Sequence, residues 1–169
     1  KANQISMLGF ATSKHLALVV PIFTRDHPEG VWTAEEERQI VLKIRDVLTD
    51  ETTKPVWQNG MFDCHYIPAV WGFAPRCWAD TMCMQHVCYP GLPSTLKPKS
   101  LHFLASVYCR YYRFWKDDPK EEGESKTAAN TFPDETELLY NADDVLYTYE
   151  VWEGLEKEID RHDQREQYN

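Results

Sequence analysis

A short apolar run that ends in a turn residue and leads directly into a helical pattern occurs twice in this sequence. Residues 55–58 form the first run, and Asn59-Gly60 marks the turn into a helix. Residues 76–79 form the second, with Asp80 placed to cap the helix that follows. Because a strand followed at once by a helix is the building unit of α/β proteins, this pattern predicts an α/β fold.

The other elements are predicted from hydrophobic spacing. Residues 5–22 form two apolar runs around a polar turn at 12–14 and predict a β-hairpin. Thr33 and Glu36 form a capping box, so a helix is expected over about residues 34–48, and a further helix is expected to begin near Ser100. A long helix is expected over residues 135–161, with an apolar stripe typical of a helix packed on a sheet: Leu138, Ala142, Val145, Tyr149 and Trp152.

The 169-residue length and the 43% hydrophobic content predict a single globular domain over residues 1–169. No apolar run approaches the roughly 18 residues of a membrane span, so no membrane partner is expected. Residues 116–134 hold almost no large apolar side chain and are expected to be a mobile loop. No secretory or transit signal precedes the first apolar run, and Lys1 looks like the start of a fragment.

The five cysteines contain no CxxC pair, which favours reduced thiols in a cytoplasm over a disulfide framework. A zinc cluster is the alternative, but the spacing of the candidate ligands matches no common zinc site. These candidates are His65, His86, His102, Cys64, Cys83 and Cys88.

The net charge of −9 argues against a protein that grips long nucleic acid through its phosphates. Residues 76–116 nevertheless carry six basic side chains and one acid, whereas the rest of the chain carries 12 basic and 26 acidic residues. This distribution suits a local anionic ligand held beside carboxylates by metal ions. An ordinary charged surface is the alternative.

Two short segments hold acids in positions that suit catalysis. Asp63 lies in the first turn of the helix after Asn59-Gly60, and residues 140–144 lie on the long C-terminal helix. Tyr140 and Asp144 are four positions apart, so a phenol and a carboxylate share one helix face within reach of the same water or metal ion. Asp80 is expected to be structural, as a helix cap.

Residues 59–63 (NGMFD) resemble the second motif, and residues 140–144 (YNADD) the third motif, of the DnaQ-like 3′–5′ exonucleases in their tyrosine-bearing DEDD branch. The segment between them is similar to the proofreading domains of family A DNA polymerases, especially phage-type ones, and the matches together span roughly residues 5–155. The resemblance implies a ribonuclease H-like mixed five-stranded sheet with flanking helices. It also implies removal of nucleotides from the 3′ end of single-stranded or frayed DNA, in the cytoplasm of a bacterium or a phage-infected cell.

The family's first motif, Asp-x-Glu on the central first strand, is missing from this chain. Asp26 follows the hairpin, and Glu29 and residues 35–37 fall in a turn and a helix, so none of them can take that position. We expect the natural sequence to carry this strand upstream of Lys1, or on a separate chain. The competing hypothesis is a chain that has lost the motif and its activity.

The resemblance implies two ions, Mg²⁺ or Mn²⁺, across the scissile phosphate. Asp144 would bind the ion that generates hydroxide, Asp63 would hold the second ion through water, and Tyr140 would orient the attacking water. Asn59 would bond the terminal sugar, and Phe62 would contact the 3′ end or pack beneath it. The nucleic-acid backbone would follow the basic stretch, where the main candidates are Lys97, Lys99 and Arg110.

Two alternatives remain. One is a catalytically inactive relative that binds single-stranded nucleic acid or braces a polymerase, and the other is an enzyme that trims RNA 3′ ends. A polymerase domain, in the same or another chain, is the expected protein partner.

Overall fold

The computed structural model describes residues 4–112 and 132–168 of the chain. The loop expected over residues 116–134 falls outside these residues except at 132–134. The strands are β1 (Met7–Ser13), β2 (Leu16–Pro21), β3 (Val56–Trp57) and β4 (Ala79–Asp80). The helices are α1 (Ala34–Thr49), α2 (Gly60–Trp71), α3 (Thr81–Cys88), α4 (Leu101–Tyr108), α5 (Glu135–Arg161), α6 (Arg165–Tyr168) and the short 3₁₀ helix η1 (Ser94–Leu96).

The strands of the described residues form two separate sheets. β1 and β2 pair antiparallel, which confirms the predicted hairpin, and a register irregularity between Ala11 and Ser13 precedes the turn. β3 and β4 pair parallel, Val56 with Ala79 and Trp57 with Asp80. A mixed α/β fold is therefore confirmed, whereas the single five-stranded sheet is not formed by the part of the chain that the structure describes.

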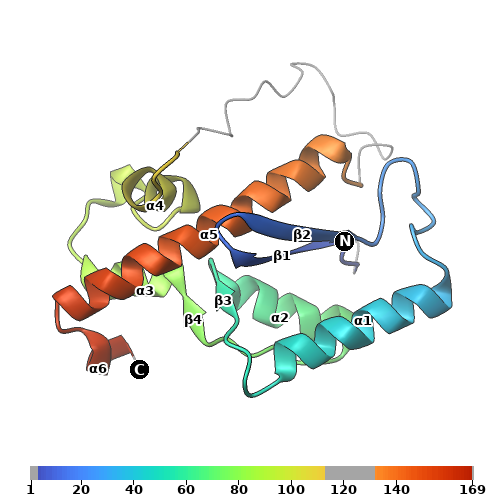
Figure 1. Cartoon of the computed structure of the whole chain (residues 1–169), viewed down its shortest axis with the longest axis horizontal. Helices are drawn as coiled ribbons and strands as arrows, with labels where there is room; N and C mark the ends of the chain where they lie inside the picture. Colours follow the sequence, from blue (N-terminus) through green and yellow to red (C-terminus); the bar gives the residue numbers. More distant parts are fainter. Residues whose placement is uncertain (1–3, 113–131, 169) are drawn as a thin grey trace.

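The two sheets lie in one layer between helices. Gly9 of β1 faces α5, while its neighbours Leu8 and Phe10 pack on a core formed with α1 and α2. β3 alternates in the same way, because Val56 packs on the core beneath α5 and Trp57 packs on the opposite core. Figure 1 shows α5 crossing the hairpin, with α1 and α2 on the opposite side of the hairpin. The architecture is therefore helix, sheet and helix.

Each face of the layer has its own hydrophobic core. The core between α3, α4, α5 and β4 is the larger, and its fully or almost fully buried members are Ala79, Met84, Cys88, Leu104, Ala105, Val151, Leu155 and Ile159. The core beneath the hairpin on the other face contains Ile5, Ile44, Leu48 and Ile67. Helix α5 supplies three of the side chains in the first core, so its position depends mainly on that core.

The start of α5 is fixed by a capping box that also anchors the chain after the hairpin. The Asp134 carboxylate accepts the Glu137 N–H at 3.0 Å, and the Glu137 carboxylate accepts the Asp134 N–H at 3.2 Å. Arg25 pairs with Asp134 at 2.9 Å and donates its backbone N–H to Pro133 at 3.0 Å. These contacts fix the residue at which α5 begins, and they thereby fix the position of Tyr140 along the helix.

Among residues 4–112 and 132–168, no helix combines the length and the apolar character that crossing a membrane requires.

Gly9 of the hairpin lies directly against α5. A Cβ on Gly9 would lie 2.1 Å from Oδ1 of Asn141 and 3.0 Å from Cγ1 of Val145. Asn141 Oδ1 is buried and has no hydrogen-bond partner among the described residues. Glycine at this position is therefore what lets α5 approach β1.

We expect Gly9→Ala to lower the free energy of unfolding by about 1–3 kcal/mol, because the new methyl overpacks against α5. In an Asn141→Ala background the nearest obstacle is removed and only the Val145 contact at 3.0 Å remains, so the same substitution should lower the free energy of unfolding by less. Urea unfolding of the four combinations measures this coupling. Gly91→Ala, at a site with no atom within 4 Å, is the control. Equal costs in both backgrounds would contradict the interpretation.

Candidate active site

The turn from β3 into α2 depends on two residues with special backbone properties. Asn59 has φ 60° and ψ 42°, a left-handed conformation that asparagine tolerates better than most residues. Gly60 lies against Trp57, where a Cβ would come within 2.5 Å of the tryptophan Cβ. This turn places Asp63 in the first turn of α2, as the sequence predicts.

Asp80 connects this turn to the next one. Its carboxylate accepts the backbone N–H of Asn59 at 3.2 Å, that of Gly60 at 2.7 Å and that of Met82 at 2.8 Å. The predicted cap on α3 is confirmed, and the same side chain also satisfies the N-terminus of α2. Asp80 is only 8% exposed, and its own N–H donates to the Tyr168 hydroxyl at 2.9 Å. One buried carboxylate therefore fixes both strand-to-helix turns.

Asp63 faces the sheet layer from α2. It lies one helical turn before the buried Ile67, so the two side chains share a helix face. Burial raises the pKa of the Asp63 carboxyl above its usual range, and the negative charge of Asp80 raises it further. A nearby cation would stabilise the charged form of Asp63 and would offset both its burial and the negative charge of Asp80.

Tyr140 and Asp144 lie on the part of α5 that covers the sheets. Asp144 is seven positions before Val151 and eleven before Leu155, so it extends the buried stripe of this helix. Tyr140 packs against the same core, and both side chains are partly exposed. The predicted shared face of the phenol and the carboxylate is therefore compatible with the observed packing.

The two acids approach the layer from its two faces, Asp63 from α2 and Asp144 from α5. Within the described ranges no group of three His, Cys, Asp or Glu side chains lies close enough to hold a metal ion. The carboxylate of Asp80 is already occupied by three N–H donors. Carboxylate oxygens suit Mg²⁺ or Mn²⁺ chemically, but the residues present do not by themselves form a site for two ions.

Gln58, directly after β3, connects the segment that contains Lys97 and Lys99 to the β3–α2 turn through hydrogen bonds. Its amide donates to the Lys99 carbonyl oxygen at 2.9 Å and accepts from the Thr81 hydroxyl. Lys97 is exposed in the same segment with φ 47°, and Lys99 is partly exposed. Two of the predicted basic residues are therefore held close to the Asn59 turn. The position of Gln58 could not be recognised from the sequence, where its only signal is a polar residue that ends an apolar run.

Two residues of the turn present their side chains to solvent. The Asn59 side chain makes no capping hydrogen bond, because Asp80 performs that function. Phe62 is 64% exposed and stacks on Tyr66 with ring centroids 5.7 Å apart. Both side chains are accessible to a ligand.

Arg110 lies elsewhere, just after the end of α4 and next to α5. Its guanidinium lies over the Tyr111 ring at 5.4 Å, and its backbone N–H donates to Glu150 at 3.1 Å. It borders a pocket of about 240 Å³ whose lining residues come from the hairpin turn, the end of α4 and α5: Lys14, His15, Arg110, Tyr111, Asp143, Leu146, Tyr147 and Glu150. Arg110 is thus near the residue that precedes Asp144, whereas Lys97 and Lys99 are near the α2 turn.

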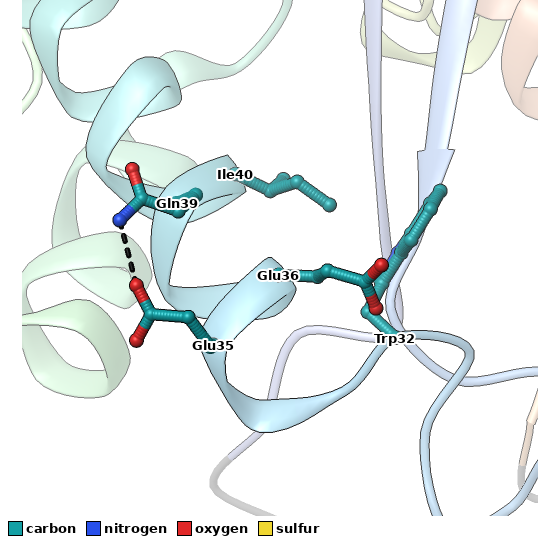
Figure 2. Close-up of a pocket in the computed structure, with 5 residues that line it drawn as sticks. All are labelled: Trp32, Glu35, Glu36, Gln39 and Ile40. Carbon is teal, nitrogen blue, oxygen red and sulfur yellow. Dashed lines mark hydrogen bonds between the residues drawn. The ribbon is translucent and has the colours of Figure 1, made fainter.

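A larger pocket, of about 320 Å³, lies at the start of α1 (Figure 2). Its lining contains none of the predicted site residues and consists of Trp32, Glu35, Glu36, Gln39 and Ile40. The Glu35 carboxylate accepts the Gln39 amide at 2.8 Å, and the Glu36 carboxylate caps the helix through Thr33. These groups serve the helix itself, so we assign the candidate site to the α2 turn and α5.

Comparison with protein families identifies the family to which this chain belongs. Residues 2–160 match a family model described as 3'-5' exonuclease, of the DNA polymerase A type. No curated protein and no solved structure matches the chain significantly. The matched range includes both motifs, residues 59–63 and 140–144.

We expect Asp80→Ala to destabilise the fold by about 2–4 kcal/mol, because three backbone N–H donors lose a charged acceptor in a buried site. Asp80→Asn retains one acceptor oxygen, so its free energy of unfolding should fall by less. Asp46→Ala, which removes an exposed carboxylate paired with Arg45, is the matched control and should change stability little. Urea unfolding would refute the role of Asp80 if the Ala variant matched the control.

The raised pKa of Asp63 predicts that its charge weakens the metal-free fold. Because the folded pKa lies above the unfolded value of about 3.9, stability is lost as the pH rises through the folded pKa. Asp63→Asn should therefore unfold at a higher urea concentration than the wild type at pH 7. The difference in urea midpoint between this variant and the wild type should shrink as the pH approaches 4, because the carboxyl of the unfolded state also binds a proton there. A variant less stable than the wild type at pH 7 would contradict this expectation.

Proposed function

Because this chain belongs to the 3'-5' exonuclease family of the DNA polymerase A type, we propose that it removes nucleotides from the 3′ end of single-stranded or frayed DNA. The observation that carries this proposal is the placement of two motifs around one sheet layer. Asp63 faces the layer from the β3–α2 turn, and Asp144 extends the buried stripe of α5. A proofreading domain that acts beside a polymerase is the corresponding biological role.

The proposed reaction depends on Mg²⁺ or Mn²⁺, which would supply an activated water and stabilise the leaving oxygen. Asp63 and Asp144 would be ligands, together with carboxylates that the described residues do not include. Tyr140 lies one turn before Asp144 on the same face and would orient the attacking water. Their contribution is to hold oxygen atoms at fixed positions against the sheet.

A fifth strand bearing Asp-x-Glu would complete both the sheet and the ligand set. In the part of the chain that the structure describes, β1 pairs only with β2 and β3 only with β4, so each sheet keeps open edges. Both sheets lie in the same layer, and such edges accept an added strand. We propose that this strand joins them into a ribonuclease H-like sheet.

The nucleic acid would approach along the exposed side of the α2 turn. Asn59 has a side chain left uncommitted by capping, and Phe62 offers an exposed ring on which a terminal base can stack. Lys97 and Lys99 are held next to this turn through Gln58 and would bind phosphates. Arg110, beside Asp143, would contact the strand at the other end of the site.

The absence of a three-ligand cluster from the described residues favours a second candidate. The chain would then be an inactive relative that binds single strands or braces a polymerase. It would retain Phe62 and the lysines as binding groups but would hydrolyse nothing. An RNA-trimming enzyme differs only in the preferred substrate and is separated from the first candidate by the assay below.

We expect Asp144→Ala, in the natural protein, to lower Mg²⁺-dependent degradation of a single-stranded DNA oligonucleotide by several orders of magnitude, as loss of a metal ligand implies. Asp63→Ala should have the same effect. Tyr140→Phe removes only the hydroxyl and should cost about 10²-fold.

The control is Asp46→Ala on the exposed face of α1, which should degrade DNA at the wild-type rate. A matched RNA oligonucleotide tests the substrate. Faster turnover of RNA would select the trimming enzyme, and tight binding of either strand without hydrolysis would select the inactive relative. Wild-type rates in Asp144→Ala would place the active face elsewhere.

A further inference from the structure

Tyr168, the last residue of the described chain, lies against the open edge of β4. The Ala79 N–H donates to the Pro55 carbonyl at 3.2 Å, on the side of β3. Because successive N–H groups of a strand point to opposite edges, the Asp80 N–H points away from β3, and it donates to the Tyr168 hydroxyl at 2.9 Å. Among the described residues β4 pairs only with β3, so this phenol takes the place of a neighbouring strand at Asp80.

Helix α6 holds the phenol in this position. The Arg165 guanidinium pairs with the Glu156 carboxylate at 2.8 Å and with the Asp160 carboxylate at 2.6 Å, and these ion pairs join α6 to the last turns of α5. Figure 1 shows α6 beside this end of α5. The Tyr168 ring also packs against the larger of the two cores. Both the ion pairs and the apolar packing therefore hold the hydroxyl opposite the Asp80 N–H.

The hydrogen bond to Tyr168 acts on the residue that fixes both strand-to-helix turns. Asp80 is 8% exposed, and its two carboxylate oxygens accept the N–H of Asn59 at 3.2 Å and that of Gly60 at 2.7 Å. A single methylene separates this carboxylate from the backbone of Asp80, so the backbone position decides where the oxygens lie. Asp63 follows Gly60 by three residues in α2. The Tyr168 hydroxyl is therefore connected to Asp63 through Asp80 and the start of α2.

We propose that Tyr168 is a positioning residue of the candidate site, which acts through Asp80 on the turn that carries Asp63. Without the hydroxyl, the N–H of the buried Asp80 loses its acceptor, and the strand end that holds the carboxylate gains freedom to move. The start of α2 then opens more often, and Asp63 spends less time where it would bind a divalent cation. The inference rests on the proposed function only for this last step.

The first test is amide hydrogen exchange of the metal-free protein, followed by NMR. In Tyr168→Phe, which removes only the hydroxyl, the amides of Asn59 and Gly60 should exchange about 3- to 10-fold faster, the equivalent of one neutral hydrogen bond. The matched control is Tyr89→Phe, which removes a hydroxyl that donates to Glu158 at the other end of α3 and should leave both amides at the wild-type rate. Unchanged exchange in Tyr168→Phe, or equal acceleration in both variants, would overturn the proposal.

The second test is a Mg²⁺ titration of DNA degradation by the natural protein. Tyr168→Phe should raise the Mg²⁺ concentration that gives the half-maximal rate by about 3- to 10-fold, and Tyr89→Phe should not change it. A merely structural role would lower the amount of folded enzyme, and hence the maximal rate, without shifting the Mg²⁺ dependence. Wild-type Mg²⁺ dependence in Tyr168→Phe would therefore contradict the positioning role.

The two tests separate this inference from the exonuclease assignment. A wild-type protein that degrades no DNA would refute the proposed function, whereas the exchange rates of Asn59 and Gly60 would still decide whether Tyr168 positions the turn. If Tyr168→Phe fails to fold, Arg165→Gln takes its place in both tests, because it loosens α6 from α5 and keeps the hydroxyl. Its effects should have the same direction and a smaller size, and wild-type behaviour of this variant in both tests would overturn the proposal.

Discussion

The carboxylate of Asp80 is the interaction on which the candidate site depends. It accepts N–H groups from the start of α2 and from the start of α3, so one negative charge serves the positive ends of two helices. The two turns are 20 residues apart in the sequence, and this contact fixes one relative to the other. The same charge raises the pKa of Asp63, so the interaction that positions the acid also makes its ionised form less favourable. A divalent cation would remove this conflict.

The arrangement of the sheets explains why the site is built from two sides. Helix α5 covers one face and α1 with α2 cover the other. The β3–β4 sheet contributes side chains to both cores, whereas the hairpin contributes Leu8 and Phe10 to the core on the side of α1 and α2. The acids therefore lie at the boundaries of the layer. The carboxylate oxygens of Asp63 and Asp144 can bind the same metal ions only together with ligands at the level of the strands. In our proposal, the added strand carries those ligands.

Local patterns in the sequence predict local structure well. The hairpin, the capping box at Thr33 and the cap at Asp80 are confirmed, because each depends on residues a few positions apart. The family resemblance drawn from residues 59–63 and 140–144 is confirmed by the family match. The roles given to Asp63, Tyr140 and Asp144 remain predictions.

Contacts between distant residues could not be predicted from the sequence. The bond from Gln58 to Lys99 spans 41 positions, and the approach of Asn141 to Gly9 joins the two ends of the chain. The strand expected at residues 76–79 begins only at Ala79, because the Arg76 N–H donates instead to the Leu48 carbonyl at the end of α1. In each case the partner belongs to another element, and no local propensity identifies it.

The length of α5 has a mechanical consequence. At 1.5 Å per residue its 27 residues span about 40 Å, and Asp144 lies roughly 10 Å along the axis from Val151, the first of its fully buried side chains. A tilt of about 5° around that anchored half would displace the carboxylate by nearly 1 Å, a shift large enough to slow a reaction about 10²-fold. If the chain has the proposed activity, its rate would therefore depend on the packing of Leu155 and Ile159, two buried residues remote from the proposed site.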